Sequence, residues 1–263
     1  MSRTKFAAFA VLLATTQLCS ASPCETEDFE SRVSGDSQCL MMRRFGVADP
    51  EVMLVWLHGD VSSGGPANYH FPIAENAAKE FAASKTLSVA IVRPGYPDGD
   101  GNSSTVDANQ GGRSDHYTKD NVTEVATAIE HLRKHFNPQK VILIGHSGGA
   151  ATSAVILGLR PALVEGALLV SCPCDLVPWR TGRKAWTRSE DPIKWTEQVS
   201  PHARIVALTG DRDDNTLPGL AQTYVQTLKA RNINAVFKAL PYETHNSAFR
   251  SSEVTNAIRD LLQ

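Results

Sequence analysis

The chain has 263 residues, of which 42% are hydrophobic and 21% charged, and its formal net charge is −2. A chain of this size and composition can bury a large core as one globular domain. The slightly acidic balance offers no basic surface for nucleic acid, and no apolar run is long enough to cross a bilayer. We therefore expect no nucleic-acid partner and no membrane span.

The N-terminus has the pattern of a secretory signal peptide. Arg3 and Lys5 precede an apolar run over residues 6–13, and small residues follow near Ala21. A basic, an apolar and a small-residue region in this order are typical of a leader that is cleaved. We predict cleavage after Ala21, which makes residues 1–21 a signal peptide.

The mature chain is predicted to be a single secreted or periplasmic domain over residues 22–263. Loss of the leader removes two positive charges and lowers the formal net charge from −2 to −4. A lipid anchor on Cys19 is an alternative. Leu18 argues against it, because such signals carry a small residue before the cysteine.

Four cysteines remain after the leader: Cys24, Cys39, Cys172 and Cys174. An oxidising destination favours pairing over free buried thiols. We predict a Cys24–Cys39 bridge, which would close a short N-terminal loop. Cys172 and Cys174 are too close in sequence for a relaxed bridge, although either could pair with one of the other two. The connectivity therefore stays open.

Strand and helix patterns alternate along the chain. We predict strands over residues 38–45, 51–57, 87–92, 140–144, 166–172, 204–209 and 235–240, and helices over residues 66–83, 120–136, 148–159, 220–231 and 247–262. Strands that alternate with helices on this scale pair in parallel through right-handed crossovers. The pattern predicts an α/β fold with a mostly parallel twisted sheet and helices on both faces. The strand over residues 38–45 is expected at an edge of the sheet.

A long polar loop precedes the second predicted helix. Residues 98–120 are rich in Gly, Asn, Asp and Ser, and loops of this length in compact domains are usually functional or mobile. Asp120 or Asn121 is the expected N-cap of the helix that ends near Phe136.

The most informative stretch is the motif Gly-His-Ser-Gly-Gly at residues 145–149. Residues 141–144 are apolar without alternation, as in a strand covered on both faces. A serine on a tight strand-to-helix turn has a strained backbone, so Gly145 and Gly149 would avoid collisions beside it. This pattern predicts a nucleophile elbow that presents Ser147 above the sheet.

A serine elbow, an acidic turn and a histidine loop follow one another in this order, which resembles the α/β-hydrolase superfamily. The resemblance covers residues 51–263. The run over residues 210–215 is similar to the acid turn of the prolyl-oligopeptidase and dienelactone-hydrolase branches. The run Arg-Pro-Gly-Tyr at residues 93–96 resembles a turn of proline-iminopeptidase-like members. The resemblance implies an α/β-hydrolase fold with a short or absent cap.

The order Ser, Asp, His assigns a catalytic triad by resemblance. Ser147 is the expected nucleophile, and a serine needs a base that takes its proton during attack. Of eight histidines, His245 alone follows the last predicted strand, so it is the expected base. Asp213 matches the family position of the acid, and Asp214 and Asp211 are the alternatives.

The family position implies an oxyanion hole made by the backbone N–H groups of Asp60 and Gly148. The plainer interpretation of the run His-Gly-Asp at residues 58–60 is a turn that ends a strand. The remaining histidines and acids show no metal-ligand spacing, so we expect no metal and no other cofactor.

Three functions are considered: a carboxylic ester hydrolase, a serine peptidase of the prolyl-oligopeptidase or iminopeptidase type, and a non-catalytic binding protein. The complete triad order weighs against the last. Few residues lie between residue 22 and the first core strand, which leaves no room for a propeller, and residues 173–202 are short for an iminopeptidase cap. Glu190 and Asp191 keep the iminopeptidase alternative open, because acids in such a cap bind an amine. We expect an esterase for a small-molecule or polymer ester; the oligomeric state is not predicted.

Three tryptophans lie where this superfamily places its cap: Trp179, Trp186 and Trp195. At least one is expected to line the substrate pocket.

Overall fold

The structure is a computed structural model that describes residues 23–110 and 112–263. The predicted signal peptide and Cys19 lie outside the described residues. None of the described helices combines the length and apolar character that a membrane span requires.

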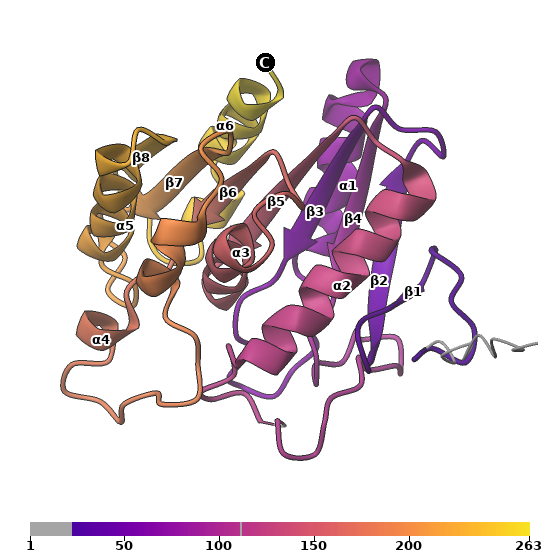
Figure 1. Cartoon of the computed structure of the whole chain (residues 1–263), viewed down its shortest axis with the longest axis horizontal. Coiled ribbons are helices and arrows are strands. Elements are labelled where there is room, and N and C mark those ends of the chain that lie inside the picture. The colour runs from indigo at the N-terminus through magenta and orange to yellow at the C-terminus, as the bar shows by residue number, and fades with distance from the viewer. Residues whose placement is uncertain (1–22, 111) are drawn as a thin grey trace, which may run out of the picture.

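Eight strands form one sheet in the order β1-β2-β4-β3-β5-β6-β7-β8 (Figure 1). Within the run β4, β3, β5, β6, β7 and β8, neighbouring strands pair in parallel. Strand β2 pairs antiparallel with β4, and β1 pairs antiparallel with β2. This confirms the predicted mostly parallel sheet. The strands are β1 (Arg32–Ser34), β2 (Cys39–Gly46), β3 (Val52–Leu57), β4 (Thr86–Ile91), β5 (Lys140–His146), β6 (Gly166–Val170), β7 (Arg204–Gly210) and β8 (Asn234–Leu240).

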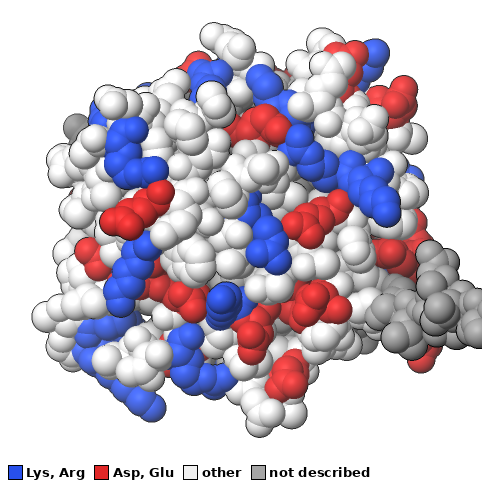
Figure 2. Space-filling view, viewed as in Figure 1, with Lys and Arg blue, Asp and Glu red and all other residues white. Residues whose placement is uncertain are grey.

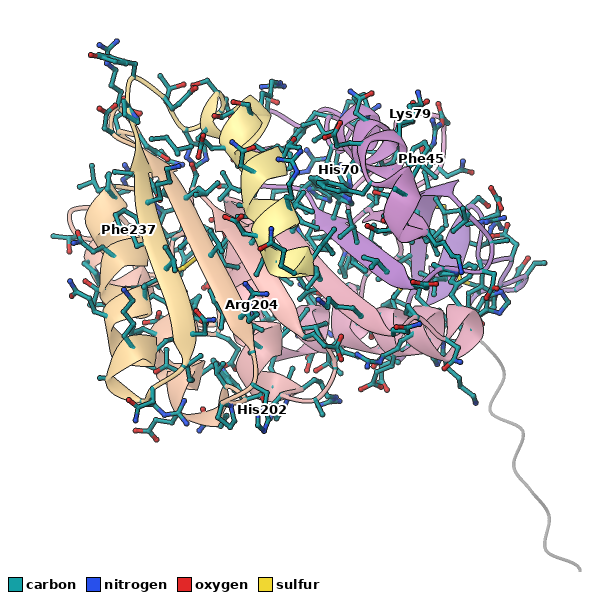
Figure 3. The ribbon with its side chains drawn as sticks, turned by 90° about the horizontal axis from the view of Figure 1, so that it is seen from above. Phe45, His70, Lys79, His202, Arg204 and Phe237 are labelled. Carbon is teal, nitrogen blue, oxygen red and sulfur yellow. A yellow bond between two sulfur atoms is a disulfide. The ribbon has the colours of Figure 1, made fainter. Side chains whose placement is uncertain are left out.

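Helices cover both faces of the sheet, as the sequence predicted. The helices α2, α3 and α5 pack into one hydrophobic cluster, and α1 and α6 pack into a second cluster across the sheet (Figure 3). The helices are α1 (Phe71–Glu80), α2 (Lys119–Phe136), α3 (Gly148–Leu159), α4 (Leu176–Trp179), α5 (Pro218–Ala230) and α6 (Ser252–Leu262), with 3₁₀ turns at Ala82–Ser84, Pro192–Gln198 and Ala248–Arg250.

Three details of the elements differ from the prediction. Strand β2 is not at the edge, because β1 pairs with its outer side. Helix α1 begins only at Phe71, with Pro72 in its first turn, where a missing N–H costs nothing. The N-cap of α2 is Thr118, whose Oγ1 accepts from the Asn121 N–H at 3.3 Å, and Asp120 lies in the first turn instead.

The predicted Cys24–Cys39 disulfide is confirmed. Cys172 and Cys174 also form a bridge, and the expectation that they are too close was wrong. Their Cα atoms lie 5.1 Å apart, within the usual range of about 4.4–6.8 Å for a disulfide. Closeness in sequence did not exclude the bridge, because the chain around Pro173 holds the two Cα atoms at a bridging separation.

Candidate active site

Ser147 lies on the turn that joins β5 to α3. Its backbone has φ 51° and ψ −117°, a combination that residues other than glycine rarely adopt. Such a conformation costs about 1–3 kcal/mol and persists only where its surroundings hold it. The Ser147 N–H donates to the carbonyl of Val170 on β6 at 2.9 Å, which fixes the turn.

The glycines on either side of Ser147 are required by close backbone contacts. A Cβ atom at Gly149 would lie 2.2 Å from the carbonyl oxygen of Leu57, the last residue of β3. A Cβ atom at Gly145 would lie 2.5 Å from the carbonyl oxygen of Gly149. Both distances are far below van der Waals contact, which confirms the steric role predicted for these glycines.

Asp213 and His245 lie side by side at the carboxyl ends of β7 and β8. The Nδ1 atom of His245 is 2.9 Å from Oδ2 and 3.1 Å from Oδ1 of the buried Asp213. The N–H groups of Thr216 and Asn215 donate to Oδ1 at 2.8 Å and 3.0 Å. Burial raises the pKa of Asp213, but the hydrogen bonds from His245 and Thr216 outweigh it and lower the pKa below its ordinary value.

The two alternative acids lie elsewhere. Asp214 is exposed, and Asp211 is exposed with Oδ1 accepting from the Tyr242 N–H at 2.7 Å. Of the three candidate acids, the structure therefore places only Asp213 beside His245.

Ser147 and His245 line the same cavity, whose volume is about 630 Å³. Within the described part of the chain, Ser147 Oγ and His245 form no hydrogen bond with each other. Catalytic hydrogen bonds are often long in a free enzyme and shorten when substrate binds. Because Nδ1 faces Asp213, the other ring nitrogen of His245, Nε2, is the one left for Ser147 or a substrate, and at present it lies 3.5 Å from the side-chain nitrogen of Asn215, which also lines the cavity.

The turn after β3 lies against the serine elbow. A Cβ atom at Gly148 would lie 2.4 Å from Oδ1 of Asp60, and one at Gly59 would lie 2.9 Å from Cβ of Ser147. Among residues 23–110 and 112–263, the N–H groups of Asp60 and Gly148 have no acceptor. The two amides predicted for the oxyanion hole therefore lie on adjoining segments and are both free to donate.

A buried ion pair neutralises the Asp60 carboxylate. The Nη2 atom of Arg93 lies 2.6 Å from Oδ1, the Tyr117 hydroxyl donates to Oδ2 at 2.6 Å, and the Tyr96 hydroxyl lies 3.4 Å from Oδ1. Burial alone would lower the pKa of Arg93, but Asp60 raises it above its ordinary value. The run Arg-Pro-Gly-Tyr was noted in the sequence, yet this pairing was not predicted.

A chain of hydrogen bonds that the sequence did not reveal joins the turn after β3 to the loop that carries His245. The Gly59 N–H donates to the Tyr69 hydroxyl at 2.5 Å, and this hydroxyl donates to Nδ1 of His146 at 2.7 Å. The Nε2–H group of His146 donates to the carbonyl of His245 at 3.0 Å, and the Ser171 hydroxyl donates to the same carbonyl at 3.3 Å. These bonds hold the backbone of His245 against β5.

Two of the three cap tryptophans line the cavity, as expected for at least one of them. Trp179 and Trp186 contact each other edge to face, with ring centroids 5.0 Å apart. Trp195 packs instead on the core and donates to the Glu190 carboxylate at 3.1 Å. Asp191 accepts from the Leu176 N–H at 2.9 Å, and neither Glu190 nor Asp191 lines the cavity.

The described residues contain no group of three or more His, Cys, Asp or Glu side chains that could hold a metal ion.

Comparisons with known proteins agree with this geometry. Residues 54–255 match the profile of the alpha/beta hydrolase family. The chain belongs to this family. The resemblance inferred from the sequence motifs is therefore confirmed. No curated protein sequence matches the chain.

Solved structures with a similar fold include esterases and a peptidase, all at low sequence identity. Est1E from Butyrivibrio proteoclasticus with bound ferulic acid has a TM-score of 0.66 and 13% identity, over 88% of this chain and 97% of that one. The esterase Pf2001 from Pyrococcus furiosus has a TM-score of 0.65 and 16% identity, over 88% and 90%. The acylaminoacyl peptidase of Pyrococcus horikoshii has a TM-score of 0.63 and 10% identity, over 87% of this chain and 39% of that one.

Four histidines around the site are buried: His58, His70, His116 and His146. Burial lowers the pKa of His70 and His146 to about 3, lowers that of His116 to about 4, and holds that of His58 well below its ordinary value. All four are therefore neutral in the folded protein near neutral pH.

We expect Gly149→Ala to destabilise the fold by at least about 2 kcal/mol, because its Cβ would collide with backbone that cannot move aside. Gly219→Ala in the first turn of α5 is the matched control, since a Cβ there meets nothing within 4 Å. Urea unfolding of both variants measures the difference. Equal stability of the two variants would show that α3 can move away from β3.

We also expect the protein to lose stability as the pH falls below about 6.5. Each buried histidine has a folded pKa below its unfolded value, so the unfolded chain binds protons that the folded chain does not. Stability is thus fully present above the unfolded pKa and falls by up to about 1.4 kcal/mol per pH unit for each group. Urea unfolding at about pH 7.5 and about pH 5.5 measures the loss.

His116→Gln removes one such group and should reduce this pH dependence. His202→Gln, at an exposed histidine, serves as the control. An unfolding free energy that stays constant between the two pH values would contradict the expectation.

Proposed function

We propose that the chain is a secreted serine hydrolase that cleaves carboxylic esters through an acyl-enzyme intermediate. The observation that carries this proposal is the arrangement of Ser147, on its strained turn, in one cavity with a histidine that contacts a buried carboxylate. Ser147 is the proposed nucleophile, His245 the general base and Asp213 the acid that orients it.

In the proposed first step, Ser147 Oγ attacks the ester carbonyl while Nε2 of His245 takes the hydroxyl proton. Asp213 keeps the proton on Nδ1 and stabilises the imidazolium that forms. The imidazolium then donates its proton to the departing alcohol as the carbon–oxygen bond breaks. Water attacks the acyl-enzyme with the same base, which releases the carboxylic acid and restores Ser147.

The oxyanion of each tetrahedral intermediate is proposed to accept hydrogen bonds from the N–H groups of Gly148 and Asp60. Both amides are free of other acceptors among the described residues, and Gly148 is the first residue of α3, whose positive dipole end favours an anion. The Asp60 carboxylate would oppose this charge if it were unpaired. Its ion pair with Arg93 offsets that effect.

An ester substrate is favoured over a peptide by the lining of the cavity. An iminopeptidase binds the substrate amine with acids of its cap, but Glu190 and Asp191 bond to neighbouring residues and do not line the cavity. An ester also has a leaving group that needs less protonation than an amine. The substrate is proposed to be a small-molecule or polymer ester.

Secretion is part of the proposal and has two supports. The first is the leader pattern over residues 1–21, and the second is the pair of disulfides, which persist in oxidising compartments.

We expect Ser147→Ala to abolish turnover and labelling by a fluorophosphonate without loss of the fold. Asp213→Asn should lower kcat by roughly 10⁴-fold, because the amide favours the wrong tautomer of the histidine. Asp214→Asn is the matched control, since this exposed carboxylate lies away from His245 and should leave kcat unchanged. Labelling of Ser147→Ala at the wild-type rate would exclude Ser147 as the nucleophile, and a larger loss in Asp214→Asn would exclude Asp213.

The ester assignment predicts a higher kcat/KM for p-nitrophenyl acetate and butyrate than for aminoacyl and prolyl p-nitroanilides. Palmitate should be a poor substrate, because the short cap leaves little apolar wall for a long chain, and each buried CH₂ contributes only about 0.8 kcal/mol. A higher rate for any anilide than for every ester would favour the serine peptidase alternative. Labelling without turnover of either class would leave the ester proposal unsupported.

A further inference from the structure

The cavity beside Ser147 has an excess of positive charge. Arg113, Arg180 and Arg183 line it, and Asp60 is the one Asp or Glu among its described lining residues. The Asp60 charge is already balanced by Arg93. Within the described chain, none of the three lining arginines lies in ion-pair contact with a carboxylate.

Most of this charge comes from one short segment. Residues 176–189, which comprise α4 and the loop after it, contain four Lys or Arg residues and no Asp or Glu. Figure 2 shows Lys and Arg side chains gathered at the lower left, over α4 and the segment that follows it. An uncompensated group of cations at a cavity attracts anions.

The guanidinium group of Arg180 is held in place by the cap tryptophans. Its central carbon lies 5.3 Å from the ring centre of Trp179 and 5.0 Å from that of Trp186. Its Nε atom donates to the carbonyl of Lys184 at 3.0 Å, and neither terminal nitrogen has a hydrogen-bond partner among the described residues. A guanidinium fixed by stacking loses little entropy when it binds a carboxylate, which it can contact with two parallel hydrogen bonds.

The same segment is tied directly to the acid turn. The Trp179 indole donates to the carbonyl of Asn215 at 2.9 Å, and Arg183 Nη1 donates to the Asn215 side-chain oxygen at 3.4 Å. The amide nitrogen of Asn215 lies 3.5 Å from Nε2 of His245. An anion bound by Arg183 would therefore lie next to the proposed catalytic base.

We propose that Arg180 and Arg183 bind a carboxylate on the acyl or alcohol part of the ester, so that the enzyme prefers anionic esters. This inference rests on the proposed function and names its substrate class. Arg113, from the loop before α2, also lines the cavity and adds positive charge, and it donates to the carbonyls of Val61 and Gly65.

The test compares anionic esters with neutral partners of similar shape. For the acyl side, 4-nitrophenyl hemiglutarate is compared with 4-nitrophenyl valerate. For the alcohol side, 4-acetoxybenzoate is compared with 4-acetoxybenzamide. In the wild type, kcat/KM should be higher for the anionic member of at least one pair by about tenfold, the scale of one charged hydrogen bond.

Arg180→Gln and Arg183→Gln should each lower this anionic-to-neutral ratio by about tenfold. Lys184→Gln is the matched control, because it removes the same charge from the same segment at an exposed residue that does not line the cavity. It should leave the ratio unchanged. A wild-type ratio at or below one in both pairs would overturn the proposal, as would an equal effect of all three substitutions.

Calorimetric binding of glutarate gives a readout that does not depend on turnover. Glutarate binding that is weakened in Arg180→Gln and Arg183→Gln but retained in Lys184→Gln would support the carboxylate site. If every ester is also inert, only the esterase proposal fails. If neutral esters are hydrolysed but glutarate does not bind and anionic esters are not preferred, only the carboxylate site is overturned.

Discussion

The close contact between the N-terminus of α3 and the end of β3 sets the geometry of the whole site. A Cβ atom at Gly149 would lie within 2.6 Å of the carbonyl oxygens of both Leu57 and His58, so the helix and the strand meet backbone to backbone. This contact brings the first free N–H groups of the helix beside the turn that carries Asp60. It also holds Ser147 in a conformation that would relax in an isolated peptide. The proposed nucleophile and the proposed oxyanion donors are thus positioned by one packing constraint.

An acidic residue beside a proposed oxyanion hole requires compensation, and the fold supplies it from β4. Arg93, which follows β4, is 2% exposed and pairs with Asp60, and its own N–H donates to Nε2 of His58 at 2.9 Å. Loss of one partner from such a buried pair typically costs about 3–5 kcal/mol, because the other charge is left without compensation. The pair therefore couples the electrostatics of the site to the stability of the adjoining strand ends.

Local constraints made part of this structure predictable from the sequence. The elbow and the position of Asp213, three residues after Gly210, depend on turns of a few residues. Such turns require particular residue types at fixed spacings, which can be recognised in the sequence. The Asp60–Arg93 and Tyr69–His146 contacts join residues 33 and 77 positions apart. Contacts of this kind depend on strand order and register, which the local pattern does not contain. The start of α1 was misplaced for a related reason, since the residues before it contact a segment distant in sequence: the Ala67 N–H donates to the carbonyl of Pro97 at 2.8 Å.

The hydrogen-bond chain through His146 requires this imidazole to be neutral. A neutral ring can accept at Nδ1 from Tyr69 and donate at Nε2 to the carbonyl of His245, whereas the protonated ring can only donate. Burial, reinforced by the neighbouring His245, lowers the pKa of His146 to about 3, so the ring is neutral and the hydrogen-bond chain keeps one direction near neutral pH. The Tyr69 hydroxyl can then accept from Gly59 and still donate onward. The burial that is expected to make the fold sensitive to acid therefore also maintains the connection between the turn after β3 and the loop of the proposed base.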